Sequence, residues 1–105
     1  MNYNVAIIGA GPAGIFAALE ITKLKPDWKV ILIEKGQKIE KRVCLLREGY
    51  EKCPNCKKCG LLCGWGGAGA FSDGKLTLTP DVGGHLVDYM SREKVEELID
   101  YSDKL

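Results

Sequence analysis

The feature that most constrains this chain is the glycine run G-A-G-P-A-G at residues 9–14, because of what stands on either side of it. An apolar run over 3–8 precedes it, and apolar residues at helical spacing follow over 15–24. A second apolar run, 28–33, ends on Glu34. Strand, glycine turn, helix, strand and acid in this order predict a βαβ unit, the dinucleotide-binding fingerprint in its required context.

Each residue of the glycine run has a physical role in such a site. Gly9 is expected to allow the tight turn out of the first strand, and Gly11 to let a pyrophosphate approach the backbone. Gly14 is expected to let the helix pack closely on the sheet. Pro12 and Ala13 begin the helix, where a missing N–H costs nothing and the free N–H groups attract phosphates. The sequence therefore predicts a dinucleotide site at residues 9–14.

Glu34, at the carboxyl end of the second strand, narrows the choice of dinucleotide. A carboxylate there accepts hydrogen bonds from ribose hydroxyls and disfavours a 2′-phosphate, so NADP is disfavoured at this site. FAD and NAD both satisfy the pattern. The helix is expected to end near Lys25, because Pro26 follows it.

Four of the five cysteines follow the spacing C-x2-C-x2-C-x3-C, at Cys53, Cys56, Cys59 and Cys63. This spacing equals the cluster-binding run of bacterial ferredoxins, although Gly64 replaces the usual proline and no second run is present. Four soft ligands also suit zinc, and C-x-x-C dithiols can cycle as a redox disulfide beside a flavin. An iron–sulfur cluster is the first hypothesis, with zinc, redox-active thiols and no metal kept as alternatives. Cys44, nine residues upstream, is a further candidate ligand.

The residues after the cysteines are unusually rich in glycine, with five glycines over 64–74. Such a segment permits close backbone approach to a flat or phosphorylated ligand, and its aromatic residues, Trp65 and Phe71, argue against a linker. Alternation over 75–79 predicts a strand that ends before Pro80.

Beyond this point the sequence is less specific about function. Ser91 is expected to cap a helix whose apolar face carries Val95, Leu98, Ile99 and Leu105. His85 is the only histidine, but it has no visible partner, so no catalytic residue is assigned.

Charge is distributed unevenly, although the net charge is only +1. Residues 35–58 carry eight basic and three acidic side chains, whereas residues 73–105 carry four basic and eight acidic. A basic stretch beside a dinucleotide site can help to hold phosphates or NAD(P)H. Nucleic acid is not expected as a partner, because there is no basic helix or interleaved aromatic pattern. A membrane is not expected either, because the apolar run 5–19 is short and broken. A cytoplasmic location would keep the cysteines reduced.

Two sets of motifs carry a family resemblance. G-A-G-P-A-G with I-E-K-G at 33–36 resembles the FAD-binding segment of the glutathione-reductase-like flavoprotein superfamily. The cysteine run at 53–63 and G-W-G-G-A-G-A-F-S-D-G-K-L at 64–76 resemble a narrower group, the FAD-dependent dehydrogenases of bacteria and archaea known as NAD(P)/FAD-dependent oxidoreductases.

The resemblance implies FAD, with its adenosine half held by Gly9, Gly11, Gly14 and Glu34. It places the glycine-rich segment against the flavin ring or the pyrophosphate, where Ser72 and Lys75 would contact ligand oxygens. On this basis the cofactor-binding prediction extends to Lys35, Gly67, Ala68, Gly69 and Ser72. Such enzymes are several times longer than 105 residues. The chain is therefore expected to be the N-terminal portion of one FAD-binding domain, completed by further polypeptide.

The fold predicted for that portion is α/β, with a parallel sheet covered by helices on both faces. Its expected parts are the βαβ unit (1–36), a Cys-rich segment (44–63), a Gly-rich flavin-side segment (64–79) and a helix (91–105). The predicted function is a FAD-dependent oxidoreductase that passes a hydride or electrons between a small-molecule substrate and an acceptor, with NAD(P)H as a candidate donor. Two alternatives stay open: an NAD-dependent enzyme using the same fingerprint, and a metal-stapled electron-transfer or binding subunit completed by another chain.

Overall fold

The computed structural model describes all residues, 1–105, which form two compact units, 1–72 and 73–105. The first unit contains strands β1 (Val5–Ile8) and β2 (Val30–Ile33) and helix α1 (Pro12–Leu24). The second contains helix α2 (Arg92–Asp103). Neither α1 nor α2 has the length and hydrophobicity of a membrane-spanning helix.

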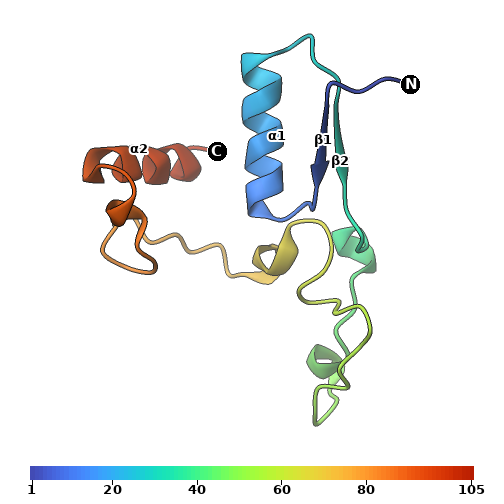
Figure 1. Cartoon of the computed structure of the whole chain (residues 1–105). Helices are drawn as coiled ribbons and strands as arrows, with labels where there is room; N and C mark the ends of the chain where they lie inside the picture. Colours follow the sequence, from blue (N-terminus) through green and yellow to red (C-terminus); the bar gives the residue numbers. More distant parts are fainter. The chain divides into compact units, whose positions relative to one another are not determined.

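Strands β1 and β2 lie side by side and pair in parallel, with α1 connecting them and packing on one side (Figure 1). The register runs from Val5 opposite Val30 to Ile8 opposite Ile33. This is the predicted βαβ unit, and it confirms the α/β fold class. Both strands begin two residues later than the apolar runs suggested, at Val5 and Val30.

Helix α1 begins and ends where the sequence signals predict. Gly11 is its N-cap and Pro12 occupies its first turn, where the absent N–H leaves no bond unmade. At the other end, the Lys25 N–H donates to the Ile21 oxygen at 2.8 Å, and Pro26 prevents continuation.

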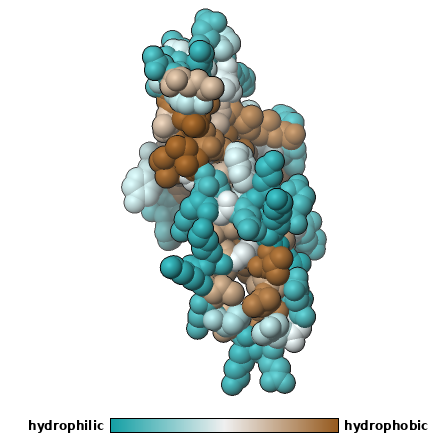
Figure 2. All heavy atoms as spheres, turned by 90° about the vertical axis from the view of Figure 1, so that its right-hand side faces the viewer, coloured by the Kyte–Doolittle hydropathy of each residue, from teal (hydrophilic) through white to brown (hydrophobic).

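Within unit 1 a helix covers one face of the sheet, and cover on the second face stays a prediction. Ile7 faces α1, since a Cβ placed on Gly14 would lie 3.4 Å from its Cγ2. Ile8 points the opposite way and is 78% exposed. Unit 1 supplies a single helix, so the second face has no cover within it. Figure 2 shows apolar side chains open to solvent among hydrophilic ones.

The rest of unit 1 has no long regular element. It contains three short 3-10 turns, η1 (Ile39–Lys41), η2 (Leu45–Glu48) and η3 (Gly67–Phe71). An isolated parallel bridge joins Gln37 to Gly64, where the chain returns to the end of β2.

In unit 2, the strand predicted over 75–79 is absent. A strand needs a hydrogen-bonded neighbour, and this segment has none, so Leu76 and Leu78 are 49% and 61% exposed. Helix α2 begins as predicted, because the Ser91 hydroxyl accepts a hydrogen bond from the Lys94 N–H. Its apolar face includes the buried Val95, but Leu105 lies beyond the helix end.

Candidate functional site

The turn between β1 and α1 has the geometry that a dinucleotide fingerprint needs. Gly9 adopts φ +101°, a conformation that L side chains rarely take, and its N–H donates to the Ile33 oxygen at 2.7 Å. A Cβ on Gly14 would collide with the Gly9 carbonyl oxygen, so α1 packs directly on the turn. These two glycines shape the turn, as the sequence predicted.

Gly11 differs from Gly14 in its surroundings and, like Gly9, it borders open space. A Cβ built on it would meet no atom within 4 Å. The glycine that was expected to face a pyrophosphate therefore has open space beside it. Ala13 and Gly14 follow in the first helical turn, where backbone N–H groups lack a partner within the helix and the helix dipole favours an anion. No acidic side chain occupies this turn.

Glu34 lies beside this turn and holds it. Its Oε2 accepts a hydrogen bond from the Ala10 N–H at 2.8 Å, and its Oε1 accepts one from the Gly36 N–H at 2.7 Å. These two bonds, first that from Ala10 and then that from Gly36, hold the pKa of Glu34 below its ordinary value. The carboxylate is therefore charged at neutral pH. Each oxygen keeps acceptor capacity for a ribose hydroxyl.

The bonds that Glu34 makes inside the protein were not anticipated from the sequence. The spacing to the glycine run identified it as a ligand of ribose, but did not show that it also fixes the backbone at Ala10. Because Ala10 is fully buried at the turn, this bond ties the end of β2 to the fingerprint.

The glycine-rich segment lies against the fingerprint. The Gly66 N–H donates to the Ala10 oxygen at 2.8 Å. A Cβ on Gly67 would be 3.5 Å from Gly11 Cα and from Pro12 Cδ, so the two backbones are near contact. Residues 67–69 thus form a second wall beside the open space at Gly11.

The other residues predicted to bind the cofactor make fewer contacts with the fingerprint turn. Ala68 and Gly69 lie within η3, where a Cβ on Gly69 would be 4.0 Å from Pro12 Cγ. Ser72 caps η3, and its N–H donates to the Gly69 oxygen at 3.0 Å. Lys75 pairs with Asp73 at 3.1 Å in the other unit.

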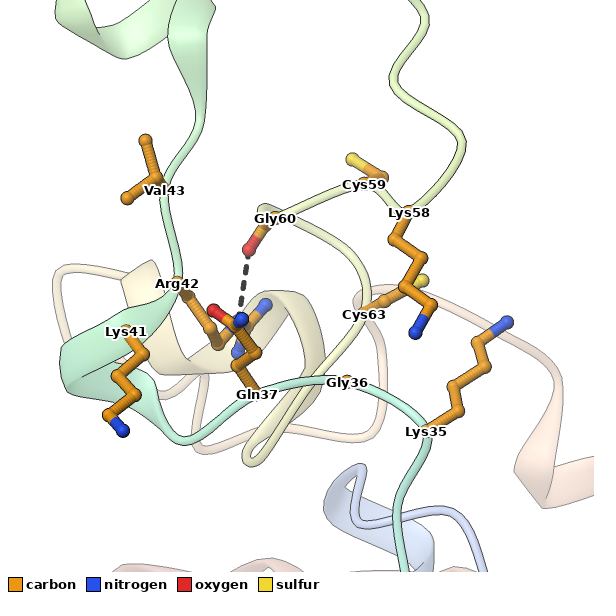
Figure 3. Close-up of a pocket in the computed structure, with 10 residues that line it drawn as sticks. All are labelled: Lys35, Gly36, Gln37, Lys41, Arg42, Val43, Lys58, Cys59, Gly60 and Cys63. Carbon is orange, nitrogen blue, oxygen red and sulfur yellow. Dashed lines mark hydrogen bonds between the residues drawn. The ribbon is translucent and has the colours of Figure 1, made fainter.

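Lys35 lines a pocket of about 280 Å³ that also contains Lys41, Lys58, Cys59 and Cys63. Figure 3 shows the side chains of Lys35 and Lys58 extending on the same side, while Lys41 extends on the other. No carboxylate lines the pocket, so its electrostatic character suits an anion. This geometry brings together parts of the basic stretch that lie far apart in sequence.

The four cysteines of the C-x2-C-x2-C-x3-C run are not gathered around one point. All five cysteines are free thiols, and Cys53 and Cys56 are exposed, whereas Cys59 and Cys63 line the pocket. Figure 3 shows the sulfur atoms of Cys59 and Cys63 pointing in different directions. No group of three or more metal-ligating side chains forms. The residues as placed do not fit a cluster or zinc, so the metal centre stays a prediction and no chemistry is derived through it.

His85 lies immediately before the short turn η4 (Leu86–Asp88), on the surface of unit 2. No nucleophile or carboxylate forms a hydrogen bond with it. The structure therefore adds no catalytic acid or base to those the sequence left unassigned.

Comparison with known proteins supports FAD as the ligand of the βαβ unit. Residues 4–43 match the family model of the FAD binding domain. This range contains β1, α1, β2 and Glu34, which are the elements that build the turn.

Two curated relatives are similar over parts of the chain. An uncharacterized protein of Clostridium beijerinckii is 41% identical over 71 residues, which cover 68% of this chain and 13% of that protein. A probable electron transfer flavoprotein-ubiquinone oxidoreductase of Acinetobacter baylyi is 43% identical over 44 residues, covering 37% of this chain and 8% of that protein. The chain thus spans a small fraction of the length of either relative. No solved structure matches it.

Proposed function

We propose that this chain is the FAD-binding segment of a flavin-dependent oxidoreductase. The observation that carries the proposal is the open space at Gly11, framed by the first turn of α1, by Glu34 and by residues 67–69. The family match over 4–43 and the flavoprotein relative of Acinetobacter baylyi point to the same cofactor. FAD supplies the redox chemistry when bound, by taking up and releasing a hydride or electrons.

The residues of this chain would bind and orient the cofactor. The free N–H groups at the start of α1 would donate to the pyrophosphate, and Gly11 would let it approach without a steric clash. Glu34 would accept hydrogen bonds from the ribose hydroxyls while its two internal bonds hold the turn in place. Residues 67–69 would limit where the rest of the cofactor can run.

The finer parts of the proposal rest on the motifs. The motifs favour membership in the glutathione-reductase-like superfamily, in its group of NAD(P)/FAD-dependent dehydrogenases. In such an enzyme, further polypeptide would bind the substrate and the electron acceptor and make the remaining contacts to the cofactor. A cytoplasmic location belongs to this proposal, because it would keep the five free thiols reduced.

NAD(P)H is the proposed electron donor, and the pocket near Lys35 and Lys58 supports a site for its phosphates. An NAD-dependent enzyme that uses the turn itself for NAD is the second candidate function. Glu34 is compatible with either ribose, so binding must decide between them.

The experiment is a titration of the protein with FAD and, separately, with NAD, followed by flavin fluorescence and by thermal stability. We expect saturable binding of FAD and a rise in Tm, with no rise for NAD. The matched control is Gly11→Val, which should lose the FAD response while keeping its circular dichroism. A Tm that rises with NAD but not with FAD would favour the nicotinamide enzyme instead.

A further inference from the structure

Arg42 is the most buried charged side chain, at 8% exposure, and its side chain also lines the pocket near Lys35 and Lys58. Its guanidinium donates to four backbone oxygens. Nε bonds Gly60 at 2.9 Å, Nη2 bonds Leu61 at 2.6 Å, and Nη1 bonds both Trp65 at 2.7 Å and Gly67 at 2.8 Å. Four of its five N–H groups are therefore used on two stretches of one loop.

No carboxylate pairs with Arg42, so its positive charge is stabilised by the dipoles of the carbonyl groups and by the face of an aromatic ring. The Phe71 ring centroid lies 4.7 Å from the guanidinium carbon. Burying a guanidinium costs desolvation free energy unless its N–H donors form hydrogen bonds. Here the planar arrangement of the N–H groups matches the positions of the four oxygens. Lysine has the charge but cannot reproduce this arrangement.

The backbone that Arg42 holds is the backbone that lies against the fingerprint. Trp65 and Gly67 accept its hydrogen bonds, while the intervening Gly66 donates to Ala10. The same three residues are therefore fixed on one side by the guanidinium and on the other by the glycine turn.

We propose that Arg42 is a positioning residue for FAD: it does not touch the cofactor, but it sets the backbone of 65–67 against the fingerprint and so fixes the second wall of the cofactor site. This inference rests on the proposed function, because the wall has a purpose only if a dinucleotide occupies the space at Gly11. The positioning is geometric, so the charge alone does not supply it.

The test compares Arg42→Lys with Arg47→Lys in the full chain. Arg47 is a matched control, because its guanidinium carbon lies 5.0 Å from the centroid of the same Phe71 ring and it forms no hydrogen bond to residues 60–67. Three properties are measured: FAD affinity by titration, the visible circular dichroism of bound flavin at saturation, and amide hydrogen exchange over 60–71 compared with α1.

We expect Arg42→Lys to weaken FAD binding about tenfold or more, to alter the flavin dichroism and to speed exchange over 60–71, while exchange in α1 stays unchanged. Arg47→Lys should leave all three properties as in the wild type. A second variant, Arg42→Met, separates charge from geometry, because it should resemble Arg42→Lys if geometry decides.

Two results would overturn the inference in distinguishable ways. If wild-type protein binds FAD and Arg42→Lys binds it equally well, the positioning role is wrong and the proposed function stands. If wild-type protein binds no FAD, the proposed function fails and the positioning role fails with it. Faster exchange in α1 as well as in 60–71 would assign Arg42 a general structural role and would also contradict the proposal.

Discussion

The βαβ unit and the segment 37–72 belong to one compact unit but are held together in different ways. In the βαβ unit a ladder of backbone bonds joins β1 to β2, and α1 lies against both strands. In 37–72 the only regular elements are short 3-10 turns, and a single buried arginine donates hydrogen bonds to four backbone carbonyl oxygens. The first region distributes its stability over many similar contacts, whereas the second concentrates it in one side chain.

Within the βαβ unit, two glycines of the fingerprint are expected to have different roles, one in cofactor binding and one in stability. Gly11→Val should abolish measurable FAD binding with little loss of stability, because its Cβ enters open space. Gly14→Ala should lower the free energy of unfolding by about 2–4 kcal/mol, because its Cβ meets the Gly9 backbone. FAD titration and chemical denaturation measure the two effects. Equal stability losses in both variants would contradict the separation of roles.

The concentration of stability in 37–72 predicts an uneven response to losing an arginine. Arg42→Met should lower the free energy of local opening of residues 60–71 by about 3 kcal/mol or more while α1 keeps its protection, because part-buried carbonyl oxygens lose their donors. Arg47→Met, which changes an exposed side chain near the same aromatic ring, should change it by less than about 0.5 kcal/mol. Native-state amide hydrogen exchange over 60–71, compared with α1, measures this in both variants. Similar losses in the two would show that the segment distributes its stability after all.

Glu34 holds the fingerprint turn and is the proposed ribose ligand, so it should respond to both mutation and pH. Glu34→Ala should weaken FAD binding about tenfold, because the hydrogen bonds to ribose and to Ala10 are lost. Since the folded protein lowers the pKa of Glu34, its contribution to stability is complete above its ordinary value of 4.5 and is lost as pH falls through the lowered value. Unfolding measured from pH 6 to pH 3 should therefore show a flatter acid limb in Glu34→Gln than in the wild type.

The smallest effect is expected in unit 2, where an exposed ion pair joins Asp81 to Arg92 at 2.8 Å. The hydrogen bond from Arg92 lowers the pKa of Asp81 to about 2. Its stabilising effect is therefore present above the ordinary pKa of 3.8 and disappears as pH falls through about 2. A carboxyl NMR titration should give a midpoint near 2, whereas the overall unfolding transition of Asp81→Asn should barely move. A midpoint near the ordinary value would show that the pair is not formed in solution.

The sequence predicted the βαβ unit well because its physics is local and periodic. Strand, glycine turn, helix and acid each leave a pattern within a few residues, and the structure confirms their order and the roles of Gly9 and Gly14. The same reasoning failed over 75–79, because alternation describes a strand but does not supply a neighbour to pair with.

The part of the site that the sequence could not reveal depends on contacts between distant residues. Nothing near Arg42 distinguishes it from the other cations of the basic stretch, because its four acceptors are backbone oxygens 18 to 25 residues away. Every residue has a backbone carbonyl oxygen, so neither residue type nor spacing in the sequence indicates which ones accept these hydrogen bonds. The cysteine run shows the opposite problem, since a clear spacing does not by itself bring thiols to one point.

The bridge between Gln37 and Gly64 brings Gly36 and Gly64 together, which has a consequence for how this chain can vary. A Cβ on Gly36 would collide with the Gly64 backbone, and a Cβ on Gly64 would lie 2.6 Å from both Arg42 Cδ and the Gln37 oxygen. Two positions that are far apart along the chain therefore share one narrow volume. Substitutions at the two should be strongly epistatic, because whatever shift admits the first side chain also changes the room left for the second. The two positions are therefore expected to coevolve. A substitution at one glycine would be tolerated only together with a change in the surroundings of the other.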